Sequence, residues 1–365
     1  MTAAERIEPA KRARVVGFDV ARCLAILSMV YVNFEIVMAP GSSDAKDPEW
    51  LRSLASMFEG NASALFVTLA GCGLVMLRRR DVILRRALLL LVFGYVWQLL
   101  WPGDILHYYA FYLAVGASCL DLSARWLWLL AAASIGGWLM MFTLLDYGAG
   151  WQWSTLDYAD FWSLRGQLRN LLFNGWHPLF PWLAFLFAGM ALARSQIHIP
   201  SRRRLALVAS ALVYAGAWLA SSWLSGLADT RSIVAQFTQW YGAPDKLWGM
   251  SSIPPGPLYV LSAGGVAIFV LALCLEVTSW PRVAAWTAPL ARTGQLALTF
   301  YLGHILVLFF LVEPLQASLM ASFEMLPLSY SAVTALLFGV GAMVFAVTWR
   351  GQRGPLEWLM RRLCG

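Results

Sequence analysis

Residues 17–33 read GFDVARCLAILSMVYVN, an apolar stretch that nevertheless carries Asp19, Arg22 and Asn33. At 100° per residue, Asp19 and Arg22 share one face of a helix, and Asn33 returns to within about 20° of Arg22 roughly 16 Å further along. A polar stripe therefore follows this helix through about half of a membrane's thickness. Ionisable groups at such depth usually face a bundle interior or a cavity, which makes them candidates for function. The alternative is a structural Asp19–Arg22 ion pair, with Arg22 extending toward the membrane surface.

The composition is that of a polytopic membrane protein. Of the 365 residues, 60% are hydrophobic and only 13% are charged, which is too apolar for a soluble domain of this size. We therefore expect an all-α fold, a single bundle of about 10 transmembrane helices over residues 17–349, with cytoplasmic tails at 1–16 and 350–365. The apolar runs that predict these helices are residues 17–38, 60–77, 82–101, 104–120, 126–145, 178–194, 205–224, 257–277, 292–312 and 329–349.

The net charge of +7 comes largely from basic clusters between the apolar runs. Besides the N-terminal tail, these clusters are Arg78–Arg80, Arg85/Arg86, Arg202–Arg204 and the arginines of 350–362. Such a pattern sets membrane orientation and gives no reason to expect a nucleic-acid partner. It predicts a multi-pass protein with both termini in the cytoplasm. Two longer loops, 146–177 and 225–256, then lie on the opposite side and are long enough to roof a cavity.

Three histidines lie in or at the ends of predicted helices: His107, His177 and His304. A histidine beside a carboxylate is a common general base, and Asp104 stands three residues before His107. His107 and His177 lie near the extracytoplasmic ends of their helices, whereas His304 lies at mid-membrane. The alternative for each is a hydrogen-bonded histidine between helices. No HxxxH or HxxE spacing supports a metal site, so we expect no metal cofactor.

Of the two extracytoplasmic histidines, His107 is the favoured base. Asp104 follows the tight turn Trp101–Gly103 and is expected to cap the fourth helix. From there it could orient the imidazole of His107. His177 precedes Pro178 at a helix start and has no carboxylate within a turn. His304 is the third candidate.

Five stretches resemble, in this order along the chain, the signature blocks of the YeiB-like family of bacterial inner-membrane proteins. They are GFDVARCLAILSMVYVN (17–33), FEGNASALFVTLAGCG (58–73), WPGDILHYYAFYLAVG (101–116), ARTGQLALTFYLGH (291–304) and RGPLEWLMRRL (353–363). That family is grouped with the lysosomal heparan-glucosaminide N-acetyltransferase in a wider transmembrane acyltransferase superfamily. The resemblance implies a bacterial inner-membrane enzyme that uses a cytoplasmic acyl-CoA, commonly acetyl-CoA, to acylate an acceptor on the other side.

The resemblance also places particular residues on family motifs. The matches are Asp19 and Arg22 on D-x-x-R, Asn33 on a polar position eleven residues later, Asp104 on G-D-I-L, and Thr299 and Tyr301 on A-L-T-x-Y. One departure matters, because the heparan enzyme carries its active-site histidine in the loop before the second helix. Glu59 is the nearest ionisable residue in this sequence. The resemblance therefore does not identify the catalytic base of this chain.

Physical chemistry predicts a compatible site. The phosphate-rich head of acyl-CoA would bind where basic groups meet the cytoplasmic helix ends, at Arg22, Arg85 and Arg86. The polar stripe would then bring the thioester toward His107 or His177. A donor to the oxyanion is also required, and Asn33, Tyr301 or a second histidine has the chemistry for it. Asp19, Thr299, Tyr301 and His304 are further candidates for binding the acyl-CoA donor.

Two other functions are alternatives to the acyltransferase. A transporter or flippase of a polar solute would use the intramembrane Asp, Arg and His as binding or proton-relay groups, although no internal repeat is evident. A non-catalytic scaffold would leave the intramembrane charges without a purpose. For the acyltransferase, the expected partners are membrane lipids, acyl-CoA and a glycan, lipid or small-molecule acceptor, and homo-oligomerisation is left open.

Overall fold

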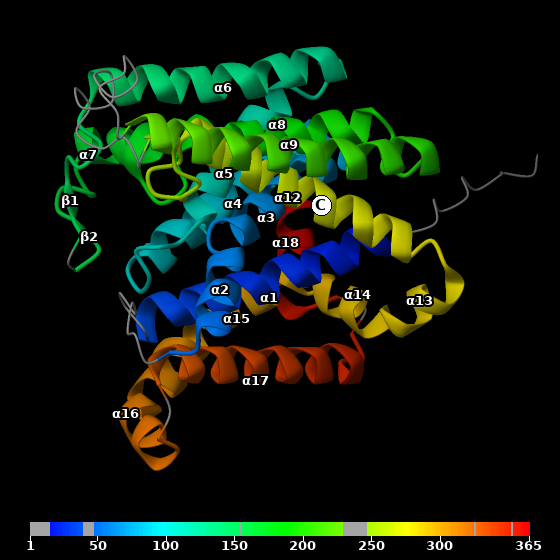
Figure 1. The fold of residues 1–365 in the computed structure, drawn as a ribbon. Coiled ribbons are helices and arrows are strands. Elements are labelled where there is room, and N and C mark those ends of the chain that lie inside the picture. Colours follow the sequence, from blue (N-terminus) through cyan, green and yellow to red (C-terminus); the bar gives the residue numbers. More distant parts are fainter. Residues whose placement is uncertain (1–14, 39–46, 154, 229–246, 325, 352) are drawn as a thin grey trace, which may run out of the picture.

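The structure is a computed structural model that describes residues 15–38, 47–153, 155–228, 247–324, 326–351 and 353–365. In these ranges the fold is helical, with one short two-stranded hairpin (Figure 1). The elements in chain order are α1 (Val16–Met38), α2 (Glu49–Phe58), α3 (Asn61–Leu77), α4 (Arg80–Gln98), α5 (Leu106–Ser118), α6 (Ala124–Leu144), β1 (Trp151–Gln152), β2 (Asp157–Tyr158), α7 (Leu164–Arg169), the π-helix η1 (Asn170–Asn174), α8 (Leu179–Arg194), α9 (Pro200–Ala228), α12 (Pro257–Val277), α13 (Pro281–Trp286), α14 (Ala288–Gly294), α15 (Ala297–Val307), the π-helix η2 (Leu308–Val312), α16 (Glu313–Ser322), α17 (Pro327–Thr348) and α18 (Pro355–Cys364).

The fold is that of an all-α polytopic membrane protein. Within the described ranges, seven helical segments are long and apolar enough to cross a membrane, and the bent pair Leu164–Asn174 and Leu179–Arg194 makes an eighth. Helices α4 and α5 correspond to the third and fourth predicted runs, but α4 begins with charged residues and α5 has 13 residues. The number of ten spanning helices therefore stays a prediction.

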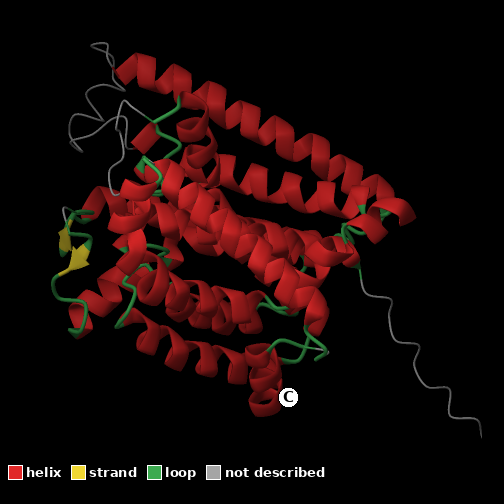
Figure 2. Ribbon diagram, turned by 90° about the horizontal axis from the view of Figure 1, so that it is seen from below, coloured by secondary structure: helices red, strands yellow, loops and turns green. Residues whose placement is uncertain are grey.

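The axes of the long helices are roughly aligned, so the bundle has two distinct ends (Figure 1). In Figure 1, β1, β2 and α7 lie at one end of the bundle and α13 and α14 at the other, and Figure 2 shows the strands at the same end from below. The basic clusters gather at the second end. Arg80 there pairs with Asp121 at 2.5 Å, and Arg203 pairs with Glu276 at 2.5 Å.

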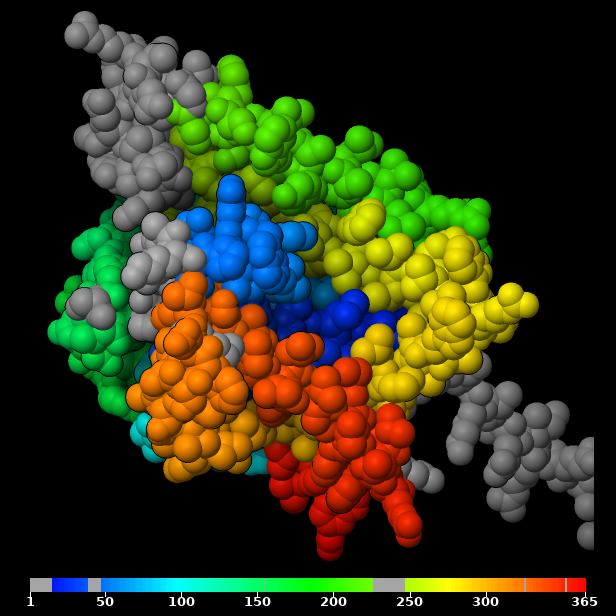
Figure 3. Space-filling model, turned by 60° about the horizontal axis from the view of Figure 1, so that its bottom comes forward, coloured from blue at the N-terminus to red at the C-terminus, as the bar shows by residue number. Residues whose placement is uncertain are grey.

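Helix α1, which contains the polar stripe, occupies the middle of the bundle. It contacts α3, α12, α14, α15 and α17. In Figure 3 it lies recessed between α17 and the yellow segment that includes α13 and α14. A Cβ atom at Gly294 would lie 1.8 Å from the carbonyl oxygen of Asp19, so α14 can approach α1 this closely only with glycine. The acidic end of the stripe is thus enclosed by α14.

Glycine also sets the position of the hairpin between α4 and α5. A Cβ at Gly94 would lie 2.3 Å from the backbone nitrogen of His107. Helix α4 therefore passes directly against the start of α5. This contact fixes His107 against α4, where Tyr95 stacks with its ring at 5.8 Å.

The predicted ninth helix, residues 292–312, is divided into the end of α14, α15 and the π-helix η2. The break after Gly294 follows from the close approach to α1, and it leaves the first N–H groups of α15 without intrahelical partners. Glu357 of α18 supplies a partner: its carboxylate accepts from the backbone N–H groups of Leu298 at 2.7 Å and Thr299 at 3.0 Å. The C-terminal segment, which was expected to be a tail outside the bundle, thereby interacts with it.

The two long loops predicted on the extracytoplasmic side differ in how much is described. The first, 146–177, contains β1, β2, α7 and η1. Most of the second, residues 229–246, lies outside the described residues. Its described end packs inward, with Leu247 in a small cluster with Trp138 and Phe173.

Candidate active site

A cavity of about 740 Å³ opens among α1, α3, α4, α5, α14, α15 and α18. Its lining includes four arginines, Arg22, Arg86, Arg353 and Arg361, and its remaining wall includes Tyr301. Arginine side chains favour phosphate and carboxylate groups because they can donate two parallel hydrogen bonds. The volume lies within the range of ligand-binding sites. The cavity can therefore take an anionic ligand of considerable size.

Arg22 participates both in an ion pair and in this cavity. Its Nη1 lies 2.6 Å from Oδ1 of Asp19, and Gln295 donates to Oδ2 of Asp19 at 3.3 Å. The Arg22 side chain nevertheless keeps 29% of its surface exposed, whereas that of Asp19 keeps 3%. The ion pair orients Arg22, and the open part of the guanidinium faces the cavity.

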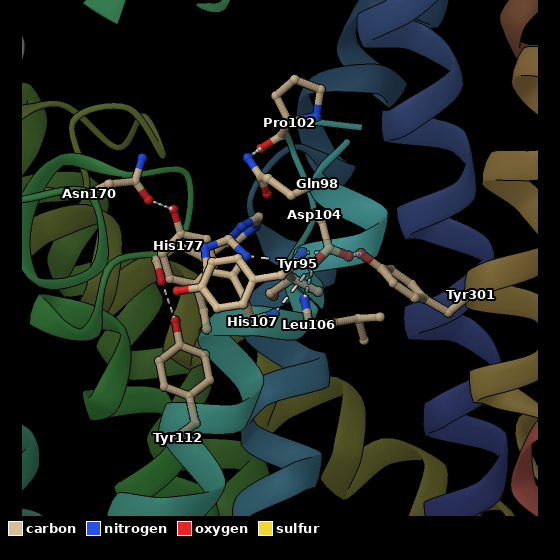
Figure 4. Close-up of polar contacts among 12 residues, drawn as sticks. Tyr95, Gln98, Pro102, Asp104, Leu106, His107, Tyr112, Asn170, His177 and Tyr301 are labelled. Carbon is tan, nitrogen blue, oxygen red and sulfur yellow. Dashed lines mark hydrogen bonds and ion pairs between the residues drawn. The ribbon is translucent and has the colours of Figure 1, made fainter. Parts of the chain in front are cut away.

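Asp104 connects the cavity wall to a buried histidine. The Tyr301 O–H donates to Oδ1 of Asp104 at 3.1 Å, and Oδ2 lies 3.6 Å from Nδ1 of His107 (Figure 4). Oδ2 also accepts from the backbone N–H of Leu106 at 2.8 Å and more weakly from that of His107 at 3.4 Å. Asp104 thus caps α5 as expected, although the helix begins at Leu106. The i, i+3 spacing brings the carboxylate and the imidazole together.

His107 is the least satisfied polar group of this region. Its side chain is 2% exposed, and among the described residues neither ring nitrogen has a partner within 3.5 Å, although Nδ1 lies 3.6 Å from Oδ2 of Asp104. The ring packs against Tyr95, Tyr108 and Phe161. Leaving a buried polar group unpaired costs about 1–3 kcal/mol. A position that carries this cost is a good candidate for one that binds a substrate or transfers a proton.

His177 has a different environment. Its Nε2 lies 3.3 Å from the hydroxyl of Ser63, and its ring packs edge-on against Trp182 at 4.7 Å. Tyr108 contacts both imidazoles, with ring centroids 3.8 Å from His107 and 5.9 Å from His177. The side-chain hydrogen-bond partner of His177 is a hydroxyl, whereas His107 faces a carboxylate.

The loop 146–177 covers His107 and ends with His177. Tyr108 donates to Asn170 at 2.5 Å, Tyr95 donates to Gln167 at 2.7 Å, and Tyr158 donates to Asn174 at 2.7 Å. Burial raises the pKa of the Tyr158 phenol, which keeps this O–H group protonated. The first two of these hydrogen bonds tie the loop to α5 and α4, and the loop roofs His107.

The other predicted site residues are dispersed. Asn33 pairs with His304, Nδ2 to Nε2 at 2.8 Å, and neither lines the cavity. Thr299 donates to Oε2 of Glu357 at 2.5 Å, and Arg85 is exposed and outside the cavity. Of the residues expected at the donor site, Arg22, Arg86 and Tyr301 line the cavity. The catalytic role of Asn33 and the donor-binding roles of His304, Thr299 and Arg85 stay predictions.

Sequence reasoning missed the contribution of the C-terminal segment. Arg353, Glu357 and Arg361 line the cavity, although this segment was expected to be a cytoplasmic tail. A signal was present in RGPLEWLMRRL. Pro355 occupies the first turn of α18, where proline is favoured, and apolar residues recur along one face. Ten residues are too few to span a membrane, so the hydropathy pattern gave no reason to place them against the bundle.

The fold and this geometry define a polytopic membrane protein with an arginine-lined cavity beside a carboxylate–histidine pair. The chain belongs to the family described as heparan-alpha-glucosaminide N-acetyltransferase, catalytic, whose model matches residues 14–224. A second family model, for a protein family of unknown function called DUF418, matches residues 186–365. Together they confirm the resemblance to the YeiB-like family and support a membrane acetyltransferase type of function. No curated protein matches the chain.

The two matched regions each supply part of the site. Arg22, Arg86, Asp104 and His107 lie in the first region, and Tyr301 and the α18 residues lie in the second. The hydrogen bond from Tyr301 to Asp104 joins them across 197 positions of sequence. The cavity is therefore lined by residues from both matched regions.

Proposed function

We propose that this protein transfers an acyl group, most simply acetyl, from cytoplasmic acyl-CoA to an acceptor on the opposite side of the membrane. The observation that carries the proposal is the 740 Å³ cavity, whose lining includes four arginines together with Tyr301, the hydrogen-bond partner of Asp104. One ligand reaching from the arginines to Tyr301 would have a polyanionic head and a slender arm. Acyl-CoA has both.

The arginines would hold the phosphates of the donor. Arg22 is oriented by Asp19, and Arg86, Arg353 and Arg361 complete the cationic part of the lining. The wall toward Tyr301 is largely apolar and includes Leu106 and Tyr109. Such a wall suits the thin pantetheine arm and excludes water from the thioester.

The chemistry needs a base on the acceptor side. The acceptor's amine or hydroxyl attacks the thioester carbonyl, the carbon–sulfur bond breaks, and CoA leaves as a thiolate, which takes up a proton to give the free thiol. His107 takes the proton of the acceptor, and Asp104 stabilises the imidazolium that forms. Tyr301 acts as a positioning residue, because its O–H is engaged by Asp104.

This function requires a defined orientation. We place residues 17–349 in the inner membrane of a bacterium as one bundle, with the N-terminal tail and residues 350–365 on the cytoplasmic side. The basic end of the bundle, with Arg80 and Arg203, then faces the cytoplasm. The loop 146–177 faces the acceptor.

The test is acyl transfer by the purified protein in lipid nanodiscs. Acetyl-CoA labelled in the acetyl group is added with and without a membrane or cell-wall extract, and thiol release and label transfer are measured. We expect CoA release that depends on the extract, with label in an extract component, and strong loss of both in His107→Ala. In proteoliposomes, passage of intact acetyl-CoA or of another solute without thioester cleavage would instead establish the transporter.

A further inference from the structure

A second cavity, of about 380 Å³, lies beside the first at the junction of α17 and α18. It is lined by Trp349, Gly351, Arg353, Gly354, Pro355 and Trp358. Arg353 also lines the 740 Å³ cavity. The side chain of Arg353 therefore borders both cavities, so a ligand that contacts Arg353 in one cavity can extend into the other.

The indole of Trp349 is held in a fixed position. Its Nε1–H donates to the carbonyl of Arg353 at 2.8 Å, and its ring stacks on Phe345 with centroids 5.2 Å apart. Arg292 donates to the carbonyl oxygens of Trp349, at 3.4 Å, and of Gly351. Both ends of the α17–α18 link are thus anchored. Trp349 therefore presents a fixed aromatic surface, and its indole N–H already has a hydrogen-bond partner.

Trp358 forms the other aromatic wall. It projects from α18 and is 51% exposed, and the guanidinium of Arg362 lies over its ring at 5.2 Å. Tryptophan is also common at membrane interfaces, where its N–H meets headgroups. Trp349 differs from that pattern, because its N–H is used within the protein and its ring borders a cavity. Arg353, which lines the same cavity, adds a preference for an anion.

We propose that this second cavity binds the purine base of the donor nucleotide, with Arg353 holding a phosphate at the junction of the two cavities. Aromatic side chains stack on nucleobases, and arginine completes such sites by binding phosphate. The proposal rests on acyl-CoA being the donor. It also assigns a function to residues outside the segment that matches the acetyltransferase model, 14–224.

The test compares two donors that differ in the nucleotide. Binding of acetyl-CoA and of S-acetyl-4′-phosphopantetheine, which lacks the nucleotide, is measured by calorimetry on the full-length protein in nanodiscs. We expect Trp358→Leu to weaken acetyl-CoA binding roughly tenfold or more and to leave the shorter donor unchanged. Trp286→Leu is the matched control, because Trp286 lies on α13, is 83% exposed and lines neither cavity.

A second measurement keeps the test independent of how Trp358→Leu folds. On the wild-type protein, adenosine 3′,5′-bisphosphate should compete with acetyl-CoA for binding. It should not displace S-acetyl-4′-phosphopantetheine. Equal affinity of wild type for both donors, or an equal loss of both in Trp358→Leu, would overturn the nucleotide site while leaving the acyltransferase intact. If wild type binds neither donor, the proposed function fails, and the nucleotide site fails with it.

Discussion

Arg22 joins the polar stripe of α1 to the cavity. We expect Arg22→Ala to weaken acetyl-CoA binding by about tenfold to a hundredfold, since a charge-assisted hydrogen bond contributes about 1.5–3 kcal/mol. Calorimetry on the nanodisc-bound protein measures this. Arg125→Ala is the control, because Arg125 is exposed at the start of α6 and does not line the cavity. Unchanged affinity in Arg22→Ala would assign Arg22 to the ion pair with Asp19 alone.

His107 is the general base in the proposed mechanism. We expect turnover in His107→Ala to fall by roughly 10² or more, the usual size of a general-base contribution. Thiol release from acetyl-CoA under saturating donor gives the rate. In His177→Ala, whose side chain bonds to Ser63 and not to a carboxylate, the fall should be smaller. Near-normal turnover in His107→Ala with collapse in His177→Ala would reverse the assignment.

Contacts between neighbours in sequence could be predicted, and contacts between distant helices could not. The spacing of Asp104 and His107, and of Asp19 and Arg22, fixes which side chains meet on a helix. The partnership of Tyr301 with Asp104 depends on how α15 crosses α5, which residue periodicity does not determine. The same holds for Asn33, a member of the polar stripe, and His304, its hydrogen-bond partner in the fold.

At the scale of elements, α18 and α15 depend on one carboxylate. Glu357 accepts from two backbone N–H groups and the hydroxyl of Thr299. Loss of a cap of this kind costs about 1 kcal/mol. We expect Glu357→Ala to lower the Tm of the detergent-solubilised protein and to loosen α18, detected as faster C-terminal proteolysis.

A double-mutant cycle separates the cap from a general loss of stability. Because Glu357 and Thr299 bond directly at 2.5 Å, their effects should not add. Thr299→Ala combined with Glu357→Ala should lose less stability than the sum of the two single changes, although the Thr299 hydroxyl also accepts from the backbone N–H of Leu356 at 3.2 Å. Full additivity of the two changes in Tm would show that the contact contributes nothing.

The elements that hydropathy predicted well are those that are long and apolar. All ten predicted runs correspond to helices of the structure, and α1, α12 and α17 agree within a few residues. The amphipathic helices α2 and α18 were not predicted, because each has ten residues and mixed polarity. The break between α14 and α15 was also missed, since it arises from the packing of Gly294 on α1 and leaves the apolar run uninterrupted.

For the whole molecule, the orientation can be tested by single cysteines in a background without the native ones. We expect Arg79→Cys to react with a membrane-impermeant reagent only after cells are opened, because the basic end should be cytoplasmic. Trp162→Cys, in the loop over the histidines, should react in intact cells. Both native side chains are exposed, 60% for Arg79 and 63% for Trp162. The opposite labelling pattern would invert the topology.

Helix α18 follows every other described helix along the sequence, and this order affects when the cavity becomes complete. Proteins emerge from the ribosome N-terminus first, so α18 is released after every other described helix. Until then the cavity lacks Arg353 and Arg361, and the first turn of α15 lacks its carboxylate partner. A nascent chain with all its spans inserted would therefore still be unable to hold its ligand. The cavity would be complete only once α18 has been released, and a chain that stalls or is truncated before α18 would lack two of the four arginines in its lining.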